Sequence, residues 1–478
     1  MTAEWPLRGS TLRERTATAV ADPVLRANVG AATDRFRAKR ASAMARVHDP
    51  DGLRSAARGV RAGILADWAA TLEQLVDNLQ ANGGQVCWAP TAADANAYIA
   101  SVARRIGART VVKSKSMATE ETGLNEALAA VGADVVETDL GEWIIQLAEE
   151  HPSHIIAPAV HKNRHQIADT FQDRAGMVER VTEPTELVAF ARRELRRRFL
   201  EADLGITGAN LGVAETGSIV LVTNEGNARM VTSMPRVHIA VMGAERVART
   251  WDEADLVLGL LAKSGTGQSL SSYTTVISGP RGEGEADGPD ELHLVILDNG
   301  RSDIAGTEFA EMLNCIRCGA CLNVCPVYRQ TGGHAYGWVY SGPMGAVLTP
   351  LLAGTAVHDH PDGAGHDHHA GELANASSLC GACMEACPVE IPLQDLLLGL
   401  RRRNAEHAGR AERALWRAWS EAWSRPGAFA ASGSVAGRTR RLAPLLARLP
   451  GARRWAGGRA MPDLPARTFR QRWDAGEV

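Results

Sequence analysis

The stretch CIRCGACLNVCP, from Cys315 to Pro326, places four cysteines at the spacing C-x2-C-x2-C-x3-C-P. A second stretch, SSLCGACMEACPVE, runs from Ser377 to Glu390 and repeats only C-x2-C-x3-C-P. Ser377 stands where the first cysteine of that run would fall. The first three cysteines of such a run wrap one [4Fe-4S] cube, and the fourth ligates the partner cube. The pattern therefore predicts a domain built around two iron–sulfur clusters.

The last cysteine of each run is expected to ligate the cluster of the other run, and this exchange predicts the ligands of each cluster. Cluster one is expected to bind Cys315, Cys318, Cys321 and Cys387. Cluster two is expected to bind Cys325, Cys380 and Cys383. We expect the last iron corner of cluster two to have no cysteine ligand from this chain. The alternatives for that corner are Ser377, a histidine, a ligand from a partner, solvent or substrate. Zinc is disfavoured, because it takes paired C-x2-C units with four ligands in total.

Composition places the rest of the chain among ordinary globular proteins. The 478 residues are 45% hydrophobic and 22% charged, which is enough for two or three folded domains. A net charge of −3 argues against a general nucleic-acid binder. The charged N-terminus has no apolar segment of the kind found in signal peptides, and the longest apolar run, Met344 to Val357, is too short to span a bilayer. We therefore expect a cytoplasmic protein without a transmembrane segment.

The cysteines are unevenly distributed along the chain. Seven of the eight lie between Cys315 and Cys387, whereas Cys87 stands alone in QVCWAP, a predicted buried strand. Such clustering in a long chain without an export signal indicates a metal or redox cofactor rather than disulfides.

Alternating strand and helix patterns follow an amphipathic, helical N-terminal region. Strands are predicted at 85–90, 108–114, 133–139 and 154–159, with helices at 91–107 and 118–132 between them. This alternation is typical of βαβ units and a parallel sheet. After a helix at 183–202, four further strands rich in β-branched residues predict that the sheet becomes mixed, namely 217–223, 236–243, 272–279 and 291–300.

The expected fold class is thus an α/β domain with a mixed or parallel sheet, then a helical cysteine domain and a helical tail. The expected boundaries are 1–84 for the N-terminal helices, 85–300 for the α/β domain, 301–400 for the cysteine domain and 401–478 for the tail.

The tail is basic and rich in tryptophan. From Arg401 onward it has 17 Lys and Arg against 6 Asp and Glu. Trp416, Trp419 and Trp423 form one helical stripe. The stripe either packs on the helical domain or docks on an acidic partner or a membrane surface.

Polar residues at predicted strand ends are the candidates for binding a small anion. Lys113 and Lys115 in KSKS follow a strand at the carboxyl edge of the sheet, where α/β folds place ligands. We expect them to bind a carboxylate or phosphate, with Glu215 as the group for proton transfer. The alternative is that all three are ordinary loop residues and helix caps.

Other local patterns carry less information. SGTGQS (264–269) and GITGANLG (205–212) lack the spacing of nucleotide-binding loops. HDHPDGAGHDHH (358–369) has five histidines and three aspartates, and it is either a metal trap or a polar loop between helices.

Several longer stretches give a family resemblance over nearly the whole chain. The two cysteine runs, GGHAYGWVYSGPMGAVLTPLL, KSKSM, GANLGVAETGSIVLVTNEGNARM and SGTGQSLSSYTTVISGPR resemble the lactate utilization protein B family. The resemblance implies an α/β domain similar to sugar-phosphate isomerases and CoA transferases, followed by an α-helical ferredoxin domain. It also implies two partners, a cysteine-rich CCG-domain protein and a second protein with the same α/β domain, which together oxidise L-lactate to pyruvate. The His/Asp-rich loop departs from the family pattern.

Three functional hypotheses follow. The leading one is an electron-transfer subunit of a cytoplasmic lactate-oxidising complex, in which the chain itself could bind a small 2-hydroxy acid. The second is an iron–sulfur adaptor of another oxidoreductase, of the glycolate or heterodisulfide type. The third is an isomerase or transferase that acts on a small anion and has structural clusters only.

Overall fold

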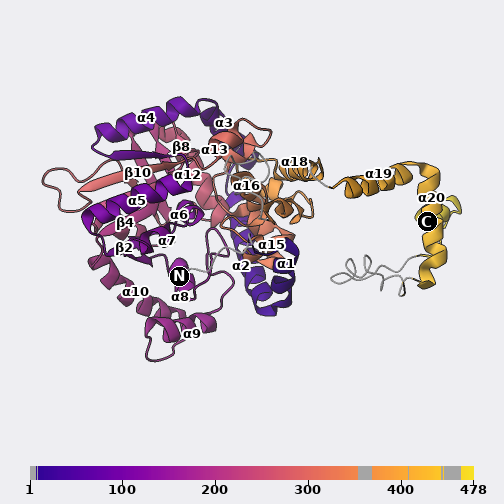
Figure 1. Ribbon diagram of the computed structural model, residues 1–478, viewed down its shortest axis with the longest axis horizontal. Coiled ribbons are helices and arrows are strands. Elements are labelled where there is room, and N and C mark those ends of the chain that lie inside the picture. Colours follow the sequence, from indigo (N-terminus) through magenta and orange to yellow (C-terminus); the bar gives the residue numbers. More distant parts are fainter. Residues whose placement is uncertain are drawn as a thin grey trace. The chain divides into compact units, whose positions relative to one another are not determined.

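The protein is described by a computed structural model, drawn in Figure 1. The structure describes residues 7, 9–353, 369–406, 409–442, 445 and 465–477. The chain divides into two compact units, residues 1–402 and 403–478, and the first contains the sheets and both cysteine runs.

Four helices precede the first strand: α1 (Leu12–Ala21), α2 (Pro23–Met44), α3 (Pro50–Ala66) and α4 (Trp68–Ala81). Thr11 and Asp22 cap the first two by accepting hydrogen bonds from backbone amides. These helices serve two different cores. Val29 of α2 is buried with the cysteine domain, whereas Leu75 and Leu79 of α4 pack on the sheet. The helices predicted for 1–84 are confirmed, but they do not form a separate layer.

The central sheet has six parallel strands in the order β1-β10-β7-β4-β2-β3. Their bounds are β1 (Gln85–Ala89), β2 (Thr110–Lys113), β3 (Asp134–Glu137), β4 (Leu204–Gly208), β7 (Val237–Gly243) and β10 (Glu291–Leu297). Alternate side chains of β10 face opposite layers: Leu294 and Ile296 pack toward α4, and Val295 and Leu297 toward α5. The sheet therefore lies between two helical layers (Figure 1).

The helices of this domain are α5 (Ala92–Ile106), α6 (Met117–Thr122), α7 (Leu124–Ala129), α8 (Leu140–Leu147), α9 (Arg164–Ala175), α10 (Pro184–Leu200), α11 (Asn227–Ser233) and α12 (Trp251–Gly265). The helix predicted over 118–132 is split into α6 and α7 at Gly123, whose φ of 66° is left-handed.

The short strand predicted at 154–159 is wrong. This segment is a buried turn, closed by a hydrogen bond from the Ser153 amide to the Pro158 carbonyl (2.9 Å). Its apolar side chains, Ile155 and Ile156, pack against the cysteine domain rather than entering the sheet.

A second sheet has the order β8-β5-β6-β9. Its strands are β5 (Leu211–Val213), β6 (Ser218–Thr223), β8 (Val247–Ala248) and β9 (Tyr273–Ile277), with a 3-10 turn, η1 (Ala214–Thr216), between β5 and β6. It contains both parallel and antiparallel pairs, so the expected mixed pairing is confirmed for β6 and β9. The other two strands of that prediction, β7 and β10, are instead parallel strands of the central sheet. Strands β4 and β5 were not predicted from the sequence.

The cysteine domain contains only helices and 3-10 turns among its described residues. These are α13 (Arg301–Ala305), η2 (Ala310–Asn314), α14 (Ala320–Val324), α15 (Pro326–Thr331), η3 (His334–Tyr336), α16 (Gly342–Leu352), η4 (His369–Asn375), α17 (Ala382–Ala386) and α18 (Leu393–Glu406). The helical fold expected for this region is confirmed. Of the His/Asp-rich loop at 358–369, only His369 belongs to the described residues.

The second unit contains α19 (Arg410–Ser424), α20 (Pro426–Thr439), η5 (Arg440–Leu442) and α23 (Phe469–Asp474). The predicted tryptophan stripe lies on α19, where Trp416 contacts Trp419 edge-on and Trp419 stacks at a tilt on Trp423. All three tryptophans are about half exposed. None of the helices within the described ranges combines the length and the apolar composition that a bilayer crossing requires.

Candidate iron–sulfur site and the adjoining cavity

The two cysteine runs have the same backbone conformation around their equivalent cysteines. Arg317 and Leu379, which precede the cysteines at 318 and 380, have left-handed φ values of 57° and 54°. Gly319 and Gly381, which follow those cysteines, have φ values of 76° and 83°. A non-glycine residue rarely adopts this region, so its recurrence at matched positions shows that the two runs follow the same path.

The match continues to the end of each run. Cys325 (φ −77°, ψ 121°) and Cys387 (φ −70°, ψ 121°) end the short helices α14 and α17 in the same extended conformation. The two helices pack against each other. The approximate duplication seen in the sequence is thus a duplication of structure.

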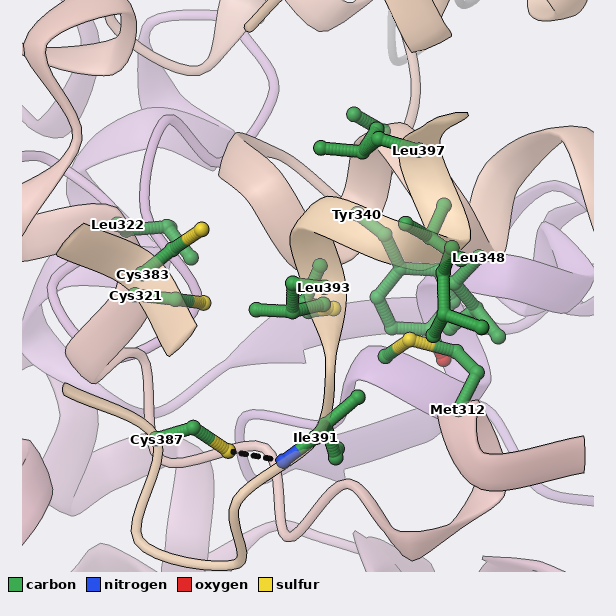
Figure 2. Close-up of a cluster of buried hydrophobic side chains, with 14 of the residues drawn as sticks. Met312, Cys321, Leu322, Tyr340, Leu348, Cys383, Cys387, Ile391, Leu393 and Leu397 are labelled. Atoms are coloured by element: carbon green, nitrogen blue, oxygen red, sulfur yellow. Dashed lines mark hydrogen bonds between the residues drawn. The ribbon is translucent and has the colours of Figure 1, made fainter. Parts of the chain in front are cut away.

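Backbone amides point at several of the sulfurs. Such hydrogen bonds stabilise the charge of a thiolate ligand. Examples are Arg317 N to Cys315 Sγ (3.4 Å), Tyr328 N to Cys325 Sγ (3.5 Å) and Ile391 N to Cys387 Sγ (3.4 Å; Figure 2).

The last cysteine of the second run, Cys387, lies beside the cysteines of the first run. Burial raises the pKa of Cys318 to about 12, and the neighbouring Cys387 thiol adds to the rise. Burial also raises the pKa of Cys321 well above its usual value, with further contributions from Cys315 and Cys318. These four thiols therefore form one electrostatically connected group.

The remaining three thiols form the second group. Burial raises the pKa of Cys325, and Cys380 adds to the rise. Burial raises the pKa of Cys383 to about 11, and Cys325 contributes next. The two groups adjoin, because Cys383 also raises the pKa of Cys321, and Figure 2 shows these two side chains on neighbouring helical segments.

The chemistry of this donor set fits iron–sulfur clusters. Buried thiols hold their protons tightly unless a metal displaces them, and metal binding is what converts such a thiol into a thiolate. All eight cysteines are free of disulfides. Within the described ranges, no three His, Cys, Asp or Glu side chains are arranged to hold a single metal ion between them. A cube distributes its thiolates over four separate irons.

Cys87 belongs to a different part of the molecule. It lies on β1, pairs in register with Val295 of β10, and packs against the core that α5 and α7 form with the sheet. The cysteines at 318, 321, 325, 383 and 387 instead belong to the core of the cysteine domain.

A cavity of about 630 Å³ lies next to the cysteine domain. Ser114, Gly208 and Gly243, at the carboxyl ends of β2, β4 and β7, line it. Ligands in α/β folds bind at this edge of the sheet, and the volume suits a small molecule. Its charged lining residues are six basic and three acidic, namely Arg35, Lys115, Lys162, Arg246, Arg301, Arg317, Asp139, Glu225 and Glu245.

The cavity reaches the first cysteine run. Arg317, which lies between the first two cysteines of that run, lines the cavity with its guanidinium 4.8 Å from the centre of the Tyr340 ring. Arg246 Nη1 donates to the Cys315 carbonyl (2.9 Å). Glu245 accepts from Arg317 Nη2 at 2.9 Å, and although burial opposes it, the charges of three neighbouring arginines lower the pKa of Glu245 to about 2.

Lys115 lines the cavity and lies near a group of carboxylates. Burial lowers the pKa of Lys115 in spite of Asp139, Glu142 and Glu225 nearby. Burial and the charge of Asp139 raise the pKa of Glu225 to about 7. Paired groups with opposite shifts in a cavity are typical of functional sites.

Lys113 and Glu215 are placed differently from Lys115. The Lys113 ammonium is fully buried and forms ion pairs of 2.7 Å with both Glu120 and Glu137. Burial alone would lower the pKa of Lys113, but these two carboxylates raise it above its usual value. Glu215 is exposed, accepts from the Trp251 amide (2.5 Å) and is not among the cavity residues. These contacts do not favour the ligand-binding role predicted for Lys113 or the proton-transfer role predicted for Glu215, and both roles stay predictions.

The arginines that join the α/β domain to the cysteine domain were not predicted from the sequence. Arg61 of α3 is fully buried, and its guanidinium donates to the backbone carbonyls of Glu245, Val247, Leu313 and Asn314. The available signal was its position on the apolar face of α3, one helical turn from Ala57 and Ile64.

Family models match three consecutive parts of the chain. Residues 72–297 match the LUD domain, residues 311–391 the 4Fe-4S dicluster domain, and residues 399–478 the C-terminal domain of lactate utilisation protein B. These matches confirm the predicted iron–sulfur domain. The number of clusters and their ligands stay predictions.

Curated relatives are similar along most of their length. Lactate utilization protein B of Bacillus licheniformis is 50% identical over 400 residues, which cover 84% of this chain and 81% of the relative. The protein of the same name from Shouchella clausii is 51% identical over 386 residues (80% and 78%), and that from Bacillus subtilis is 48% identical over 400 residues (84% and 81%).

A solved structure, a DUF162 family protein from Deinococcus radiodurans, aligns with 48% of this chain and 98% of its own, at 17% identity and a TM-score of 0.28. That score is too low to bear on the fold. The curated relatives and the three matched domains decide the family: the chain belongs to the lactate utilization protein B family.

Proposed function

We propose that this chain is the iron–sulfur electron-transfer subunit of a cytoplasmic complex that oxidises L-lactate to pyruvate. The observation that carries the proposal is the pairing of two matched cysteine runs, whose last cysteines lie with the opposite run. The names of the relatives, which refer to lactate utilization, supply the substrate.

The proposed ligands follow the two thiol groups. Cluster one takes Cys315, Cys318, Cys321 and Cys387, and cluster two takes Cys325, Cys380 and Cys383. When bound, each cube supplies one-electron redox chemistry, so that two cubes suit the two electrons of lactate oxidation. The chain contributes burial, which excludes water from all these thiols except Cys315 and Cys380, and the amides that point at the sulfurs.

The proposed partners are a cysteine-rich CCG-domain protein and a second protein with a LUD domain. Cys380, the exposed member of the second thiol group, supports a surface at which electrons pass to a partner. A cluster close to the surface is accessible to a partner's redox centre, whereas the first group is largely enclosed by α2, α3 and the sheet domain.

We also propose that the cavity holds a small 2-hydroxy acid. Basic residues outnumber acidic ones in its lining, which favours an anion. Lys115 is the proposed carboxylate-binding group, since no ion pair with a carboxylate within 4.0 Å is present for it among the described residues, in contrast to Lys113. Glu225, with its raised pKa, is the proposed proton-holding group.

The decisive experiment is anaerobic purification of the chain with iron, sulfide and EPR measurement. Two cubes predict about eight irons per chain and clusters that are reduced when L-lactate and both partners are added. Clusters that form but stay silent to lactate and partners would support structural clusters and an isomerase or transferase instead.

Growth of a deletion strain on L-lactate distinguishes the proposed function from the remaining alternative. A strain without this protein is expected to lose growth on L-lactate and to regain it with the wild-type gene. Normal growth on lactate would point to an iron–sulfur adaptor of a glycolate or heterodisulfide-type oxidoreductase.

A further inference from the structure

The second thiol group provides three cysteines for a cube that has four iron corners. This fourth corner belongs to the second cluster, so the inference rests on the proposed function, in which that cluster is present. Because the two runs have the same fold, the first run shows where the fourth ligand of the second cluster is expected.

In the first run, the residue at this place is Cys315. Its sulfur accepts a hydrogen bond from the amide of Arg317, two residues later, at 3.4 Å. Arg317 is one of the residues with a left-handed φ, and this conformation turns its amide back toward the sulfur.

In the second run, the same place is taken by Ser377. Its hydroxyl oxygen accepts a hydrogen bond from the amide of Leu379, again two residues later, at 3.1 Å. Leu379 has a φ of 54°, against 57° for Arg317. The Ser377 oxygen thus has the same relation to its run as the Cys315 sulfur has to the first run.

The backbone at Ser377 is also fixed from outside the run. Arg401 of α18 donates from Nη2 to the Ser377 carbonyl (2.8 Å) and from Nε to the Ala374 carbonyl (2.9 Å). Ser377 is half-buried, whereas the next residue, Ser378, is exposed. The structure therefore fixes the position of Ser377, as expected for a ligand, and leaves Ser378 exposed.

Two other side chains of the chain fit this corner poorly. Cys87 is partly buried on the edge strand β1 and packs against the core of the sheet, which is separate from the core that contains Cys325 and Cys383. His154 has both ring nitrogens engaged, Nε2 with Asn323 Oδ1 (3.1 Å) and Nδ1 with the Ile156 amide (3.0 Å).

We propose that the Ser377 side-chain oxygen is the fourth ligand of the second iron–sulfur cluster. Ligation breaks the Ser377 O–H bond and forms an Fe–O bond. The proton passes to solvent and no electron is transferred. An oxygen is a harder ligand than sulfur, so this iron corner differs in electronic character from the seven corners with cysteine ligands.

The test uses the full chain, purified anaerobically from cells fed serine that carries the magnetic oxygen isotope in its hydroxyl group. Electron–nuclear double resonance on the reduced clusters is expected to show oxygen hyperfine coupling in the wild-type chain. The coupling is expected to persist in Ser378→Ala and to be lost in Ser377→Ala and Ser377→Cys.

The variants also have a readout that does not depend on labelling. Ser377→Cys supplies the ligand type of the first run, so it is expected to keep the wild-type iron content, and its cluster EPR spectrum is expected to change. Ser377→Ala is expected to lose about one iron per chain and to show the EPR signal of a three-iron cluster.

The outcomes are distinguishable from a failure of the proposed function. A chain without two clusters contradicts that function. Two clusters with coupling from labelled water instead of labelled serine would show that solvent occupies the corner, and the Ser377 assignment would be wrong. That assignment is equally wrong if the serine coupling is absent from the wild type or survives in Ser377→Ala.

Discussion

Glu225 faces the cavity with a pKa raised to about 7 by burial and by Asp139, so its charge changes near neutral pH. The net charge of the cavity lining is more positive when Glu225 is neutral than when it is ionised. The pKa shift also has a consequence for stability. The folded chain holds this proton more tightly than the unfolded chain, so the free energy of unfolding falls as pH rises from the usual pKa of Glu to about 7.

Binding of L-lactate to the purified chain is therefore expected to weaken as pH rises through about 7. In Glu225→Gln the affinity should be nearly independent of pH, because a neutral amide replaces the titrating group. In Lys115→Met the affinity should fall at least tenfold at every pH, because the proposed partner of the carboxylate is removed. Anaerobic calorimetry at a series of pH values measures all three.

Glu283→Gln is the matched control, since Glu283 is exposed and does not line the cavity. It should keep the wild-type pH dependence. If Glu225→Gln also keeps it, the ionisation of Glu225 does not govern binding.

For single residues, the sequence predicts the arrangement of the cysteines well and the surroundings of the lysines poorly. Cysteine spacing is a local property, and both runs fold as their spacing indicates. Lys113 and Lys115 are two residues apart in the same motif, yet one is enclosed by Glu120 and Glu137 and the other lines a cavity. That difference depends on α6 and β3, which the motif itself does not contain.

The two cysteine runs depend on glycines that turn the chain between ligands. Gly319 has a φ of 76°, and a Cβ at this position would lie 3.0 Å from Ile156 Cδ1 and 3.3 Å from His154 Cε1. An alanine there has to adopt the left-handed conformation at a cost of about 1–2 kcal/mol, and it also displaces buried neighbours.

Gly319→Ala is expected to lower both the iron content and the thermal midpoint of the purified chain. Iron analysis and anaerobic calorimetry measure the two effects. Gly259→Ala on α12 is the control, because the nearest atom to its Cβ would be Lys263 Nζ at 3.8 Å. It should leave the iron content unchanged and stabilise the helix by up to ~1 kcal/mol. An unchanged Gly319→Ala chain would show that the turn tolerates a side chain.

Most elements of the α/β domain could be predicted, because hydrophobic periodicity determines their type. The exceptions have physical reasons. The apolar segment at 154–159 is buried as expected, but its partner is the cysteine domain, and a pattern of burial does not reveal the partner. The glycine-containing sequence of β4 does not have the composition of a typical strand. It is a strand because β2 and β7 lie on either side of it and pair with its backbone.

Across the whole molecule, the first helices contact the last cysteine run. Arg40 Nη2 donates to the Ala386 carbonyl (2.9 Å), and Arg54 Nε donates to the Cys387 carbonyl (3.1 Å). Leu12 N donates to Glu372 (2.7 Å). Periodicity predicts that these N-terminal segments are helical, but contacts between residues more than 300 positions apart cannot be read from it.

A chain that ends after residue 406 is expected to keep the iron content and EPR spectrum of the full chain, because residues 403–478 form a compact unit of their own. A chain that lacks residues 1–44 is expected to lose most of its iron, because α1 and α2 pack on the cysteine domain. Iron analysis of both truncated chains is the measurement. Loss of iron from the first, or its retention in the second, would contradict this division of roles.

The contact between Arg40 and Ala386 spans 346 residues, and this separation has a consequence for biosynthesis. Ribosomes add about 5–20 residues per second, so α2 leaves the ribosome roughly 20–70 seconds before its partner exists. The sheet can fold during that interval, whereas Val29 of α2 becomes buried only when the cysteine domain, with which it shares a core, has been made. The second cysteine run is therefore made last among these elements, and only its arrival gives the Arg40 guanidinium, from one of the first helices of the chain, its carbonyl partner.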